Sequence, residues 1–585
     1  MRLLTLVPLL AVAAAHVEHI QRRSQPGAVQ PTPVDLTPLQ WGDVNVISTT
    51  DTHGWLAGNT REGSYSADFG DFSSFISHMR DQANHRRQDL LVVDSGDLHD
   101  GNGLADATPL SGQVSNPIFQ KINYDALAIG NHELYLPEIA EDTYKNFARK
   151  WGRRYLTSNT FIKDAHTNKT VPIGRLYNKF RMKFGTRVMS YGFLYNFKGA
   201  ANNTVLESSN VTVTLPWFQK ASCLQFQPSS LKEDVDMYLI VGHVPVRWAE
   251  AKVVISAIRA VHPSKPILLF GGHMHVRDFT AYDPRAYGLS AGRFMETIGW
   301  MSVSGIRDRS CRVEANCIGK NLTVSRRYLD TNLHTYKTHS LAHPKQKFDT
   351  WRGRKISQEI TKQRKALGIS TKLGCAPQDY YLNRYPYADS RSLLKLVTDE
   401  ILPFSVIDKT RPNPAFVVIN SGSQRFDVSK GAFTVDDTYV VSPFHNDFVY
   451  TTLPYKAAKS ILNALNKAPF QKRDDGDRPA PTTNATLTPG YVTKDDYGYG
   501  GDDWPHSPIP YVAGANYVSS PIPTGLNDND LVDVAWLPFF TNLMLPILKN
   551  LDPAGNHTGL PYAVGVTTNE MWPVFVKGKW GNSTC

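Results

Sequence analysis

The sequence predicts an α/β fold in two domains: a larger domain of mixed β-sheets with flanking helices and a smaller α+β domain. Short apolar runs alternate with polar loops and with stretches of helical spacing, which is typical of strands covered by helices. At 585 residues the chain is too long for one hydrophobic core. Its content of 41% hydrophobic and 20% charged residues is that of a folded globular protein.

The N-terminal residues are expected to precede the folded part of the chain. Residues 1–15 have a basic start at Arg2, an apolar core and an Ala-Ala-Ala end, which predicts a signal peptide, with a signal anchor as the alternative. Residues 16–40 contain several prolines and are expected to form a linker or a surface leader. The expected parts that follow are the larger domain at 41–335, a linker with a connecting helix at 336–385, and the smaller domain at 386–585.

Five apolar runs in the larger domain each lead into a loop that carries Asp, Asn or His. The runs are residues 44–48, 90–93, 126–129, 237–241 and 267–270. In open α/β sheets, functional sites form just beyond the carboxyl ends of strands. The candidate ligands in the five loops are Asp51, His53, Asp97, Asn131, His243, His273 and His275. A single Asp-x-His is more often a turn than a ligand, but five such loops in order indicate a two-metal hydrolase site of mixed carboxylate and imidazole ligands.

The order and spelling of these loops resemble the calcineurin-like metallophosphoesterases, and within them the 5'-nucleotidases of fungal type. The motifs are Asp-Thr-His at 51–53, Gly-Asp at 96–97, Gly-Asn-His at 130–132, Gly-His at 242–243 and Gly-Gly-His-Met-His at 271–275. The resemblance covers about residues 41–305 and continues more weakly to about residue 520. It implies a four-layer α/β/β/α sandwich for the larger domain and two divalent metal ions, which could be Zn, Mn, Fe or Mg.

The resemblance also implies a role for each ligand. Asp97 would bridge the two ions, and a hydroxide shared by the ions would attack phosphorus. The remaining ligands fall into two sets: Asp51, His53 and His275 for the first ion, and Asn131, His243 and His273 for the second.

His132 follows a ligand, and the resemblance implies that it is the general acid that protonates the leaving group. In the family's nucleotidases an Asp three positions further on orients this histidine, but here that position is Tyr135. Asp100 or Glu133 could take its place, and the sequence does not decide between them. His99, beside the bridging carboxylate, is expected either to support a ligand or substrate or to be an exposed loop residue.

The smaller domain carries weaker marks. Amphipathic residues 390–402 are expected to begin its core, and residues 416–419 to form a strand. The following loop and the Pro-Phe-His and Gly-Gly-Asp segments are similar to nucleotidase segments that contact the substrate and stack on its base. The residues expected to bind substrate are Asn420, Arg425, Phe444, Tyr497 and Asp502. The alternatives are Tyr499 in place of Tyr497, or aromatic residues that merely pack in the core.

Several features predict a secretory route, extracellular or vacuolar. The glycosylation sequons are Asn168, Asn202, Asn210, Asn321, Asn484, Asn556 and Asn582. The five cysteines are taken as structural; Cys311 and Cys317 could close a small loop, and the odd number leaves one unpaired or paired between chains. After the N-terminal segment no stretch is long and apolar enough for a transmembrane span, and the polar C-terminus has no lipid-anchor signal.

Taken together, these features predict a dinuclear metal-dependent phosphoester hydrolase whose small-molecule substrate is a nucleoside phosphate. The net charge is +10, but the basic residues are scattered, so nucleic-acid binding is not expected. Two alternatives stay open: a phosphomonoesterase or phosphodiesterase with a non-nucleotide substrate, and a secreted binding protein with a lapsed site. The complete set of seven ligands argues against the lapsed site. The sequence indicates no oligomeric state.

Overall fold

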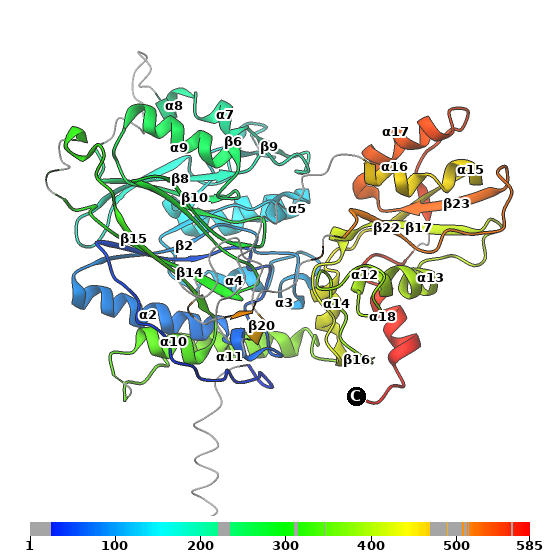
Figure 1. Ribbon diagram of the computed structural model, residues 1–585, viewed down its shortest axis with the longest axis horizontal. Helices are drawn as coiled ribbons and strands as arrows, with labels where there is room; N and C mark the ends of the chain where they lie inside the picture. The colour runs from blue at the N-terminus through cyan, green and yellow to red at the C-terminus, as the bar shows by residue number, and fades with distance from the viewer. Residues whose placement is uncertain are drawn as a thin grey trace, which may run out of the picture.

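The computed structural model describes the chain apart from residues 1–24, 166, 220–233, 309, 311–313, 344, 468–487, 490–502, 504–505, 508–511, 513 and 563–564. Within the described residues no helix is long and apolar enough to cross a membrane. Two bodies lie side by side in Figure 1, the larger one formed by the N-terminal part of the chain.

Two six-stranded sheets form the centre of the larger body. The first sheet contains, in spatial order, β15 (Thr323–Asp330), β14 (Thr297–Ser304), β1 (Val44–Thr49), β2 (Asp89–Asp94), β3 (Ala126–Ala128) and β4 (Tyr155–Leu156). The second contains β12 (Arg277–Asp283), β13 (Ala286–Ala291), β11 (Ile267–Gly271), β10 (Met237–His243), β8 (Arg187–Leu194) and β7 (Tyr177–Arg181). Strands β1 to β4 are parallel, as are β8, β10, β11 and β13.

Side chains on the two faces of these strands belong to different cores, which explains why the strands are apolar throughout. In β1, Val44 and Val46 pack between the two sheets, whereas Ile47 faces the helices outside the first sheet. In β10, Leu239 packs between the sheets and Ile240 packs under the helix of the second sheet. The four-layer α/β/β/α prediction is therefore confirmed.

Helices cover the outer face of each sheet (Figure 1). Outside the first sheet lie α2 (Phe69–Arg86), α10 (Leu333–Ser340) and α11 (Trp351–Ala366), and outside the second lies α9 (Ala249–Val261). Helix α2 begins with a capping box in which Asp68 and Asp71 bond to each other's backbone N–H groups. Helix α11, within the expected connecting segment, packs Ile356 and Ile360 into the core outside the first sheet.

The expected leader is anchored to this helical layer. Gln25 is buried, with an exposed fraction of 3%. Its Nε2 donates to Asp68 Oδ2 over 2.8 Å, and its Oε1 accepts from Thr361 Oγ1 over 3.1 Å. Further along, the carbonyl of Val34 lies 2.6 Å from His334 Nε2. The first described residues therefore lie on the surface of the larger body, and specific polar contacts hold them there.

The smaller body has a core of its own around a five-stranded sheet. The strand order is β22 (Tyr517–Ser519), β17 (Ala415–Asn420), β23 (Leu531–Trp536), β19 (Phe448–Pro454) and β24 (Leu560–Tyr562). The strand expected at 416–419 lies within β17. The helix expected at 390–402 is found as α12 (Leu393–Leu396), the π-helical η8 (Val397–Ile401) and α13 (Leu402–Ser405). Helices α15 (Tyr455–Ala458), α16 (Ile461–Lys467), α17 (Thr541–Leu551) and α18 (Met571–Phe575) also pack in this body.

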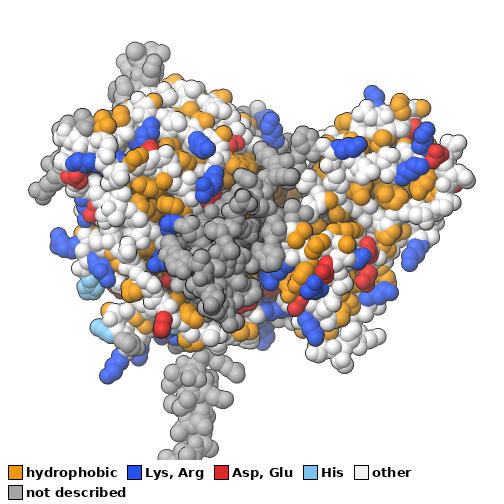
Figure 2. Space-filling view, viewed as in Figure 1, with side chains coloured by type: hydrophobic (Ala, Val, Ile, Leu, Met, Phe, Trp, Pro, Cys, Tyr) orange, Lys and Arg blue, Asp and Glu red, His pale blue; other side chains and the backbone are white. Residues whose placement is uncertain are grey.

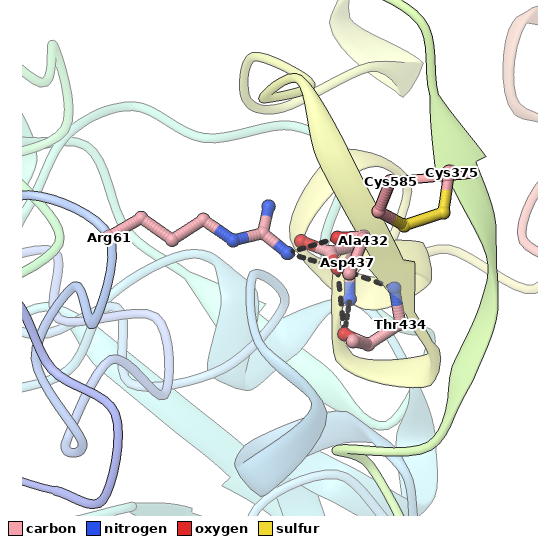
Figure 3. Close-up of a disulfide and its surroundings, with 6 residues drawn as sticks. All are labelled: Arg61, Cys375, Ala432, Thr434, Asp437 and Cys585. Atoms are coloured by element: carbon pink, nitrogen blue, oxygen red, sulfur yellow. Dashed lines mark hydrogen bonds and ion pairs between the residues drawn. A yellow bond between two sulfur atoms is a disulfide. The ribbon is translucent and has the colours of Figure 1, made fainter.

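A disulfide joins the last residue of the chain to this smaller body. Cys585 is bonded to Cys375 in β16 (Lys372–Ala376), which pairs with β18 (Gly431–Thr434) (Figure 3). Cys317 is also disulfide-bonded. Its expected partner Cys311 lies outside the described residues, as does Cys223.

Polar and apolar contacts join the two bodies around α14 (Val435–Val441). Asp436 pairs with Arg364 of α11 over 2.7 Å, and its Oδ1 accepts the backbone N–H of Gly103 over 2.9 Å. Asp437 pairs with Arg61 over 2.7 Å (Figure 3). Beside these pairs, Trp55, Phe294 and Val440 form a small buried cluster, with Phe426 packed against it. The second body is thereby held against the loops that follow β1 and β2.

Charged side chains are dispersed over the face of the molecule that Figure 2 shows. On the visible part of the face in Figure 2, Lys and Arg side chains lie singly among acidic, apolar and polar ones. This agrees with the scattered basic residues of the sequence.

Candidate metal centre

The candidate ligands meet because neighbouring parallel strands end at the same edge of each sheet. Residue 49 at the end of β1 pairs with residue 94 at the end of β2, and residue 94 pairs with residue 127 of β3. The loops with Asp51, Asp97 and Asn131 therefore start side by side. His243 is the last residue of β10, and His273 and His275 follow the adjacent β11.

The ligand atoms form two groups that share one carboxylate. Asp51, His53, Asp97 and His275 offer atoms that all lie within 4.8 Å of one another, as do Asp97, His243 and His273. All of these residues are buried except His273, which is half-buried. Asp97 Oδ2 lies 3.8 Å from His53 Nε2 and 2.9 Å from His243 Nε2. Asp97 is thus the residue that the two groups have in common.

Asn131, the remaining candidate ligand, has its side-chain amide held on one side only. Its Nδ2 donates to the phenolic oxygen of Tyr135 over 2.8 Å. Its Oδ1 is buried and has no hydrogen-bond partner among the described residues. A buried amide oxygen without a partner is costly, and a cation would satisfy it.

The backbone is strained at most of these positions. Five of the seven candidate ligands have φ between 43° and 78°, the left-handed region that non-glycine residues rarely adopt: Asp51, His53, Asp97, His273 and His275. Such strain concentrates at functional sites, where the surrounding structure holds it in place.

The buried carboxylates of the cluster are stabilised by positive charge, as the shifted pKa values of its residues indicate. Burial raises the pKa of Asp51 to about 6, with His243 opposing the shift and Asp97 adding to it. Burial also lowers the pKa of His53 well below its usual value, and the charge of His132 adds to this. Burial opposes ionisation of Asp97, but His243 and His132 outweigh it and hold the pKa of Asp97 well below its usual range. Burial would lower the pKa of His243, yet Asp97 and Asp51 raise it to about 10. Divalent cations would supply the charge that a protonated imidazole provides here.

His132 lies beside the cluster and bonds to a carboxylate from another loop. Its Nδ1 is 2.6 Å from Asp100 Oδ2, and its Nε2 is 3.8 Å from Asp97 Oδ2. Tyr135 packs edge-on against the imidazole, with ring centroids 4.6 Å apart, and does not bond to Nδ1. Of the two carboxylates left open by the sequence, Asp100 is the one that contacts His132.

The other carboxylate, Glu133, holds two ligand loops together. Its two oxygens accept the backbone N–H groups of Asp97 (3.1 Å), Leu98 (2.6 Å) and Gly130 (2.8 Å).

His99 is buried, so the exposed-loop alternative is wrong. Its carbonyl oxygen lies 2.5 Å from Nδ1 of His53, which leaves Nε2 of His53 to face the cluster.

Two of the expected substrate residues reach this centre from the smaller body. Arg425 Nη2 lies 3.4 Å from His132 Nε2. The ring of Phe444 is 6.2 Å from that of His132 at an interplanar angle of 24°, and 5.7 Å from the guanidinium carbon of Arg425. Asn420 ends β17, and the short η9 turn (Ser421–Ser423) leads from it towards Arg425.

The other two expected residues, Tyr497 and Asp502, lie outside the described part of the chain. Their neighbour Asp503 is buried, and its Oδ1 lies 2.9 Å from Nε2 of His339 in α10. The backbone N–H of Asp503 donates to the carbonyl of Tyr328 in the first sheet over 3.3 Å.

Three aromatic residues near His273 were not predicted from the sequence: Tyr195, Phe197 and Trp248. The ring of Tyr195 stacks on His273, with centroids 4.0 Å apart, and Trp248 contacts both rings. Phe197 lies between Tyr195 and Tyr135. Tyr195 directly follows β8 at the edge where the ligand loops meet, so the strand-end rule could have found it.

Comparisons with known proteins agree with this geometry. The smaller body matches the family model of the C-terminal domain of NAD nucleotidases over residues 379–482 and 470–545. A protein of Arthroderma benhamiae named "Secreted protein" is 37% identical over 94% of each chain. An uncharacterized protein of Schizosaccharomyces pombe is 35% identical, covering 88% of this chain and 87% of that one.

Two solved structures extend the comparison. The crystal structure of 5'-nucleotidase from Candida albicans has a TM-score of 0.84 and 34% identity, covering 94% of this chain and all of that one. A 5'-nucleotidase precursor from Thermus thermophilus shares the fold at a TM-score of 0.58 and 16% identity, over 92% of this chain and 96% of that one.

Proposed function

The chain belongs to the 5'-nucleotidase family of the calcineurin-like phosphoesterases, and from this premise we propose that it hydrolyses nucleoside phosphates at a dinuclear metal centre. It is therefore a hydrolase. The observation that carries the dinuclear assignment is the position of Asp97 in both ligand groups. The observation that favours a nucleotide is the approach of Arg425 and Phe444 to His132 from the smaller body.

The residues present fit two divalent ions. One would be held by Asp51, His53, Asp97 and His275, and the other by Asp97, Asn131, His243 and His273. Zn, Mn, Fe and Mg all suit parts of such a mixed nitrogen and oxygen set. Two such ions activate water at neutral pH and neutralise phosphate oxygens.

The protein's own side chains would bind the substrate and move one proton. Arg425 would pair with phosphate oxygens, since its guanidinium is the cation that the smaller body brings beside His132. His132, with Nδ1 against Asp100, would donate the Nε2 proton to the leaving oxygen of the nucleoside. Phe444 would stack on the base, and Asn420, Tyr497 and Asp502 would complete the substrate site.

The proposed location is the secretory pathway, outside the cell or in the vacuole. The name of the Arthroderma benhamiae relative and the N-terminal segment of this chain support it. N-terminal sequencing and mass spectrometry of the secreted protein should find a start near residue 16 and glycans at the sequons. A chain that retains Met1 and carries no glycans contradicts the proposal.

Replacing the bridging carboxylate tests the metal centre. Asp97→Asn should lower hydrolysis of every phosphoester at least tenfold and reduce the bound metal, because a lost catalytic-metal function costs several kcal/mol. Purified wild type and variant are assayed with several divalent metals on nucleoside monophosphates, sugar phosphates and a diester, and metal content is measured. Near-normal activity in the variant rules out a dinuclear mechanism.

The same panel separates the alternatives. The match to the C-terminal domain of NAD nucleotidases favours one second candidate, a dinucleotide joined by a diphosphate, so NAD belongs in the panel. Preference for a sugar phosphate or a diester would support a non-nucleotide substrate. Nucleotide binding without turnover under every metal condition would support a binding protein with a lapsed site.

A further inference from the structure

We propose that Asp100 is the positioning residue that orients His132 in the reaction, and that Tyr135 instead fixes the amide of the ligand Asn131. This inference rests on the proposed function, because it takes His132 to be the acid. It assigns separate tasks to two neighbouring loops: the loop after β2 supplies the partner of the imidazole, and the turn after β3 supplies the partner of the amide.

The contact between His132 and Asp100 selects one orientation of the imidazole. Nδ1 is 2.6 Å from Asp100 Oδ2, and both side chains are largely buried, with exposed fractions of 4% and 12%. When Nδ1–H donates to this carboxylate, Nε2 is the ring atom that points towards Asp97 and Arg425, at 3.8 and 3.4 Å. The substrate oxygen would have to lie on this side, between the ligands of the larger body and the arginine of the smaller one.

The loop that carries Asp100 is built to hold this carboxylate still. The carboxylate of Asp106 accepts three successive backbone N–H groups, from Asp100 (3.1 Å), Gly101 (2.7 Å) and Asn102 (3.1 Å). Asp100 itself has a φ of 63°, in the left-handed region. Gly101 packs against His53, since a Cβ atom there would lie 2.8 Å from Cβ of that ligand. The three bonds fix the backbone of residues 100–102, which keeps the Asp100 carboxylate beside His132.

Glu133 and Tyr135 are not placed to orient the imidazole of His132. The carboxylate of Glu133 is occupied by three backbone N–H groups of the ligand loops. Tyr135 meets His132 with its ring edge-on, and its hydroxyl accepts from Nδ2 of Asn131 over 2.8 Å. That bond directs the other amide atom, Oδ1, away from Tyr135, where it stays buried and without a protein partner among the described residues. Because the side chain of Tyr135 is a neutral phenol, position 135 adds no third negative charge beside Asp97 and Asp100.

The test compares substrates that differ in their need for a proton. Asp100→Asn should lower kcat on a nucleoside monophosphate about 100-fold, the lower end of what general acids contribute. It should change kcat on p-nitrophenyl phosphate less than threefold, because that leaving group departs unprotonated. KM and bound metal should stay at the wild-type values. The matched control is Asp125→Asn, which removes a carboxylate paired with Arg80 at the opposite end of β3 and should alter neither substrate.

A double-variant cycle shows whether the two residues act as one unit. His132→Ala should produce the same pattern as Asp100→Asn, and the double variant should lose no more than His132→Ala alone. Tyr135→Phe should show the opposite signature: a lower affinity for metal in titrations of the metal-depleted protein, with the ratio between the two substrates unchanged.

Each outcome decides a different statement. If Asp100→Asn lowers both substrates equally or releases metal, Asp100 is a structural residue of the metal loop and the proposal is wrong. Additive losses in the double variant also overturn it. If His132→Ala itself shows no dependence on the leaving group, the acid role in the proposed function fails instead. Unchanged metal affinity in Tyr135→Phe removes the task assigned to Tyr135.

Discussion

Replacing Cys585 by Ser should destabilise the smaller body and weaken its contact with the larger one. The Cys375–Cys585 disulfide spans 210 residues. Closing a loop of that length restricts the unfolded chain by ~5 kcal/mol in the chain-entropy description, and loss of native disulfides is typically measured at about 2–5 kcal/mol. For a domain of this size, that corresponds to a fall in Tm of roughly 5–15 °C.

The position of the disulfide links this loss to the site. Cys375 is the strand partner of Ala432, whose carbonyl accepts from Arg61 of the larger body over 2.7 Å (Figure 3). Arg61 also pairs with Asp437 at the start of α14. A looser β16–β18 pair should therefore raise KM for a nucleotide, since Arg425 and Phe444 reach His132 only when the bodies are in contact.

Calorimetry and kinetics on purified Cys585→Ser and wild type would measure both effects. We expect the transition of the smaller body to move to lower temperature while that of the larger body stays in place. Reducing agent is a poorer perturbation, because Cys317 is disulfide-bonded too. Equal unfolding temperatures in variant and wild type would refute the stability argument, and an unchanged KM would refute the link to the site.

Two further predictions concern a base contact and a buried acid. Phe444→Ala should raise KM for nucleoside monophosphates about tenfold or more, because it removes one base–aromatic stack. It should leave kcat, and KM for a sugar phosphate, unchanged. An equal rise in KM for both substrates contradicts base stacking. Burial raises the pKa of Asp94 to about 8, so the contribution of Asp94 to the stability of the metal-free protein should be greatest below about pH 4 and should fall, by ~5 kcal/mol at most, as the pH rises to 8. Asp94→Asn should restore the lost free energy of unfolding at pH 8, measured by chemical denaturation, because a neutral amide can keep the contact with Thr49. A variant less stable than wild type at that pH would show that Asp94 is ionised in the folded protein.

The fold and the ligand cluster could be predicted because their signals are local. Each expected ligand follows an apolar strand within a few residues, and parallel strands end at a common edge whatever the rest of the chain does. The structure brings the candidate ligands Asp51, His53, Asp97, His243, His273 and His275 into two groups that share Asp97. The domain boundaries and the roles of these residues remain predictions.

Contacts between distant segments could not be predicted in the same way. The partner of His132 comes from a loop 32 residues earlier, and its choice over Glu133 depends on hydrogen bonds that only the folded loops define. The Cys375–Cys585 pair joins residues 210 positions apart, beyond any spacing rule. The sequence places Gln25 in a proline-rich leader, but its side chain bonds to Asp68, the residue that caps α2, and to Thr361 of α11.

Under the proposed function, the contact between the two bodies would determine the selectivity of the site. The larger body alone supplies every candidate metal ligand, the proposed acid His132 and its carboxylate partner Asp100. Arg425, which would pair with phosphate oxygens, and Phe444, which would stack on the base, come from the smaller body. Nη2 of Arg425 lies 3.4 Å from Nε2 of His132, and the ring centroids of Phe444 and His132 are 6.2 Å apart. The reach of Arg425 and Phe444 depends on the pairs of Asp436 and Asp437 with Arg364 and Arg61. Weakening those pairs should therefore raise KM for a nucleotide more than KM for a simple phosphate ester, because both substrates would lose Arg425 but only the nucleotide would also lose Phe444.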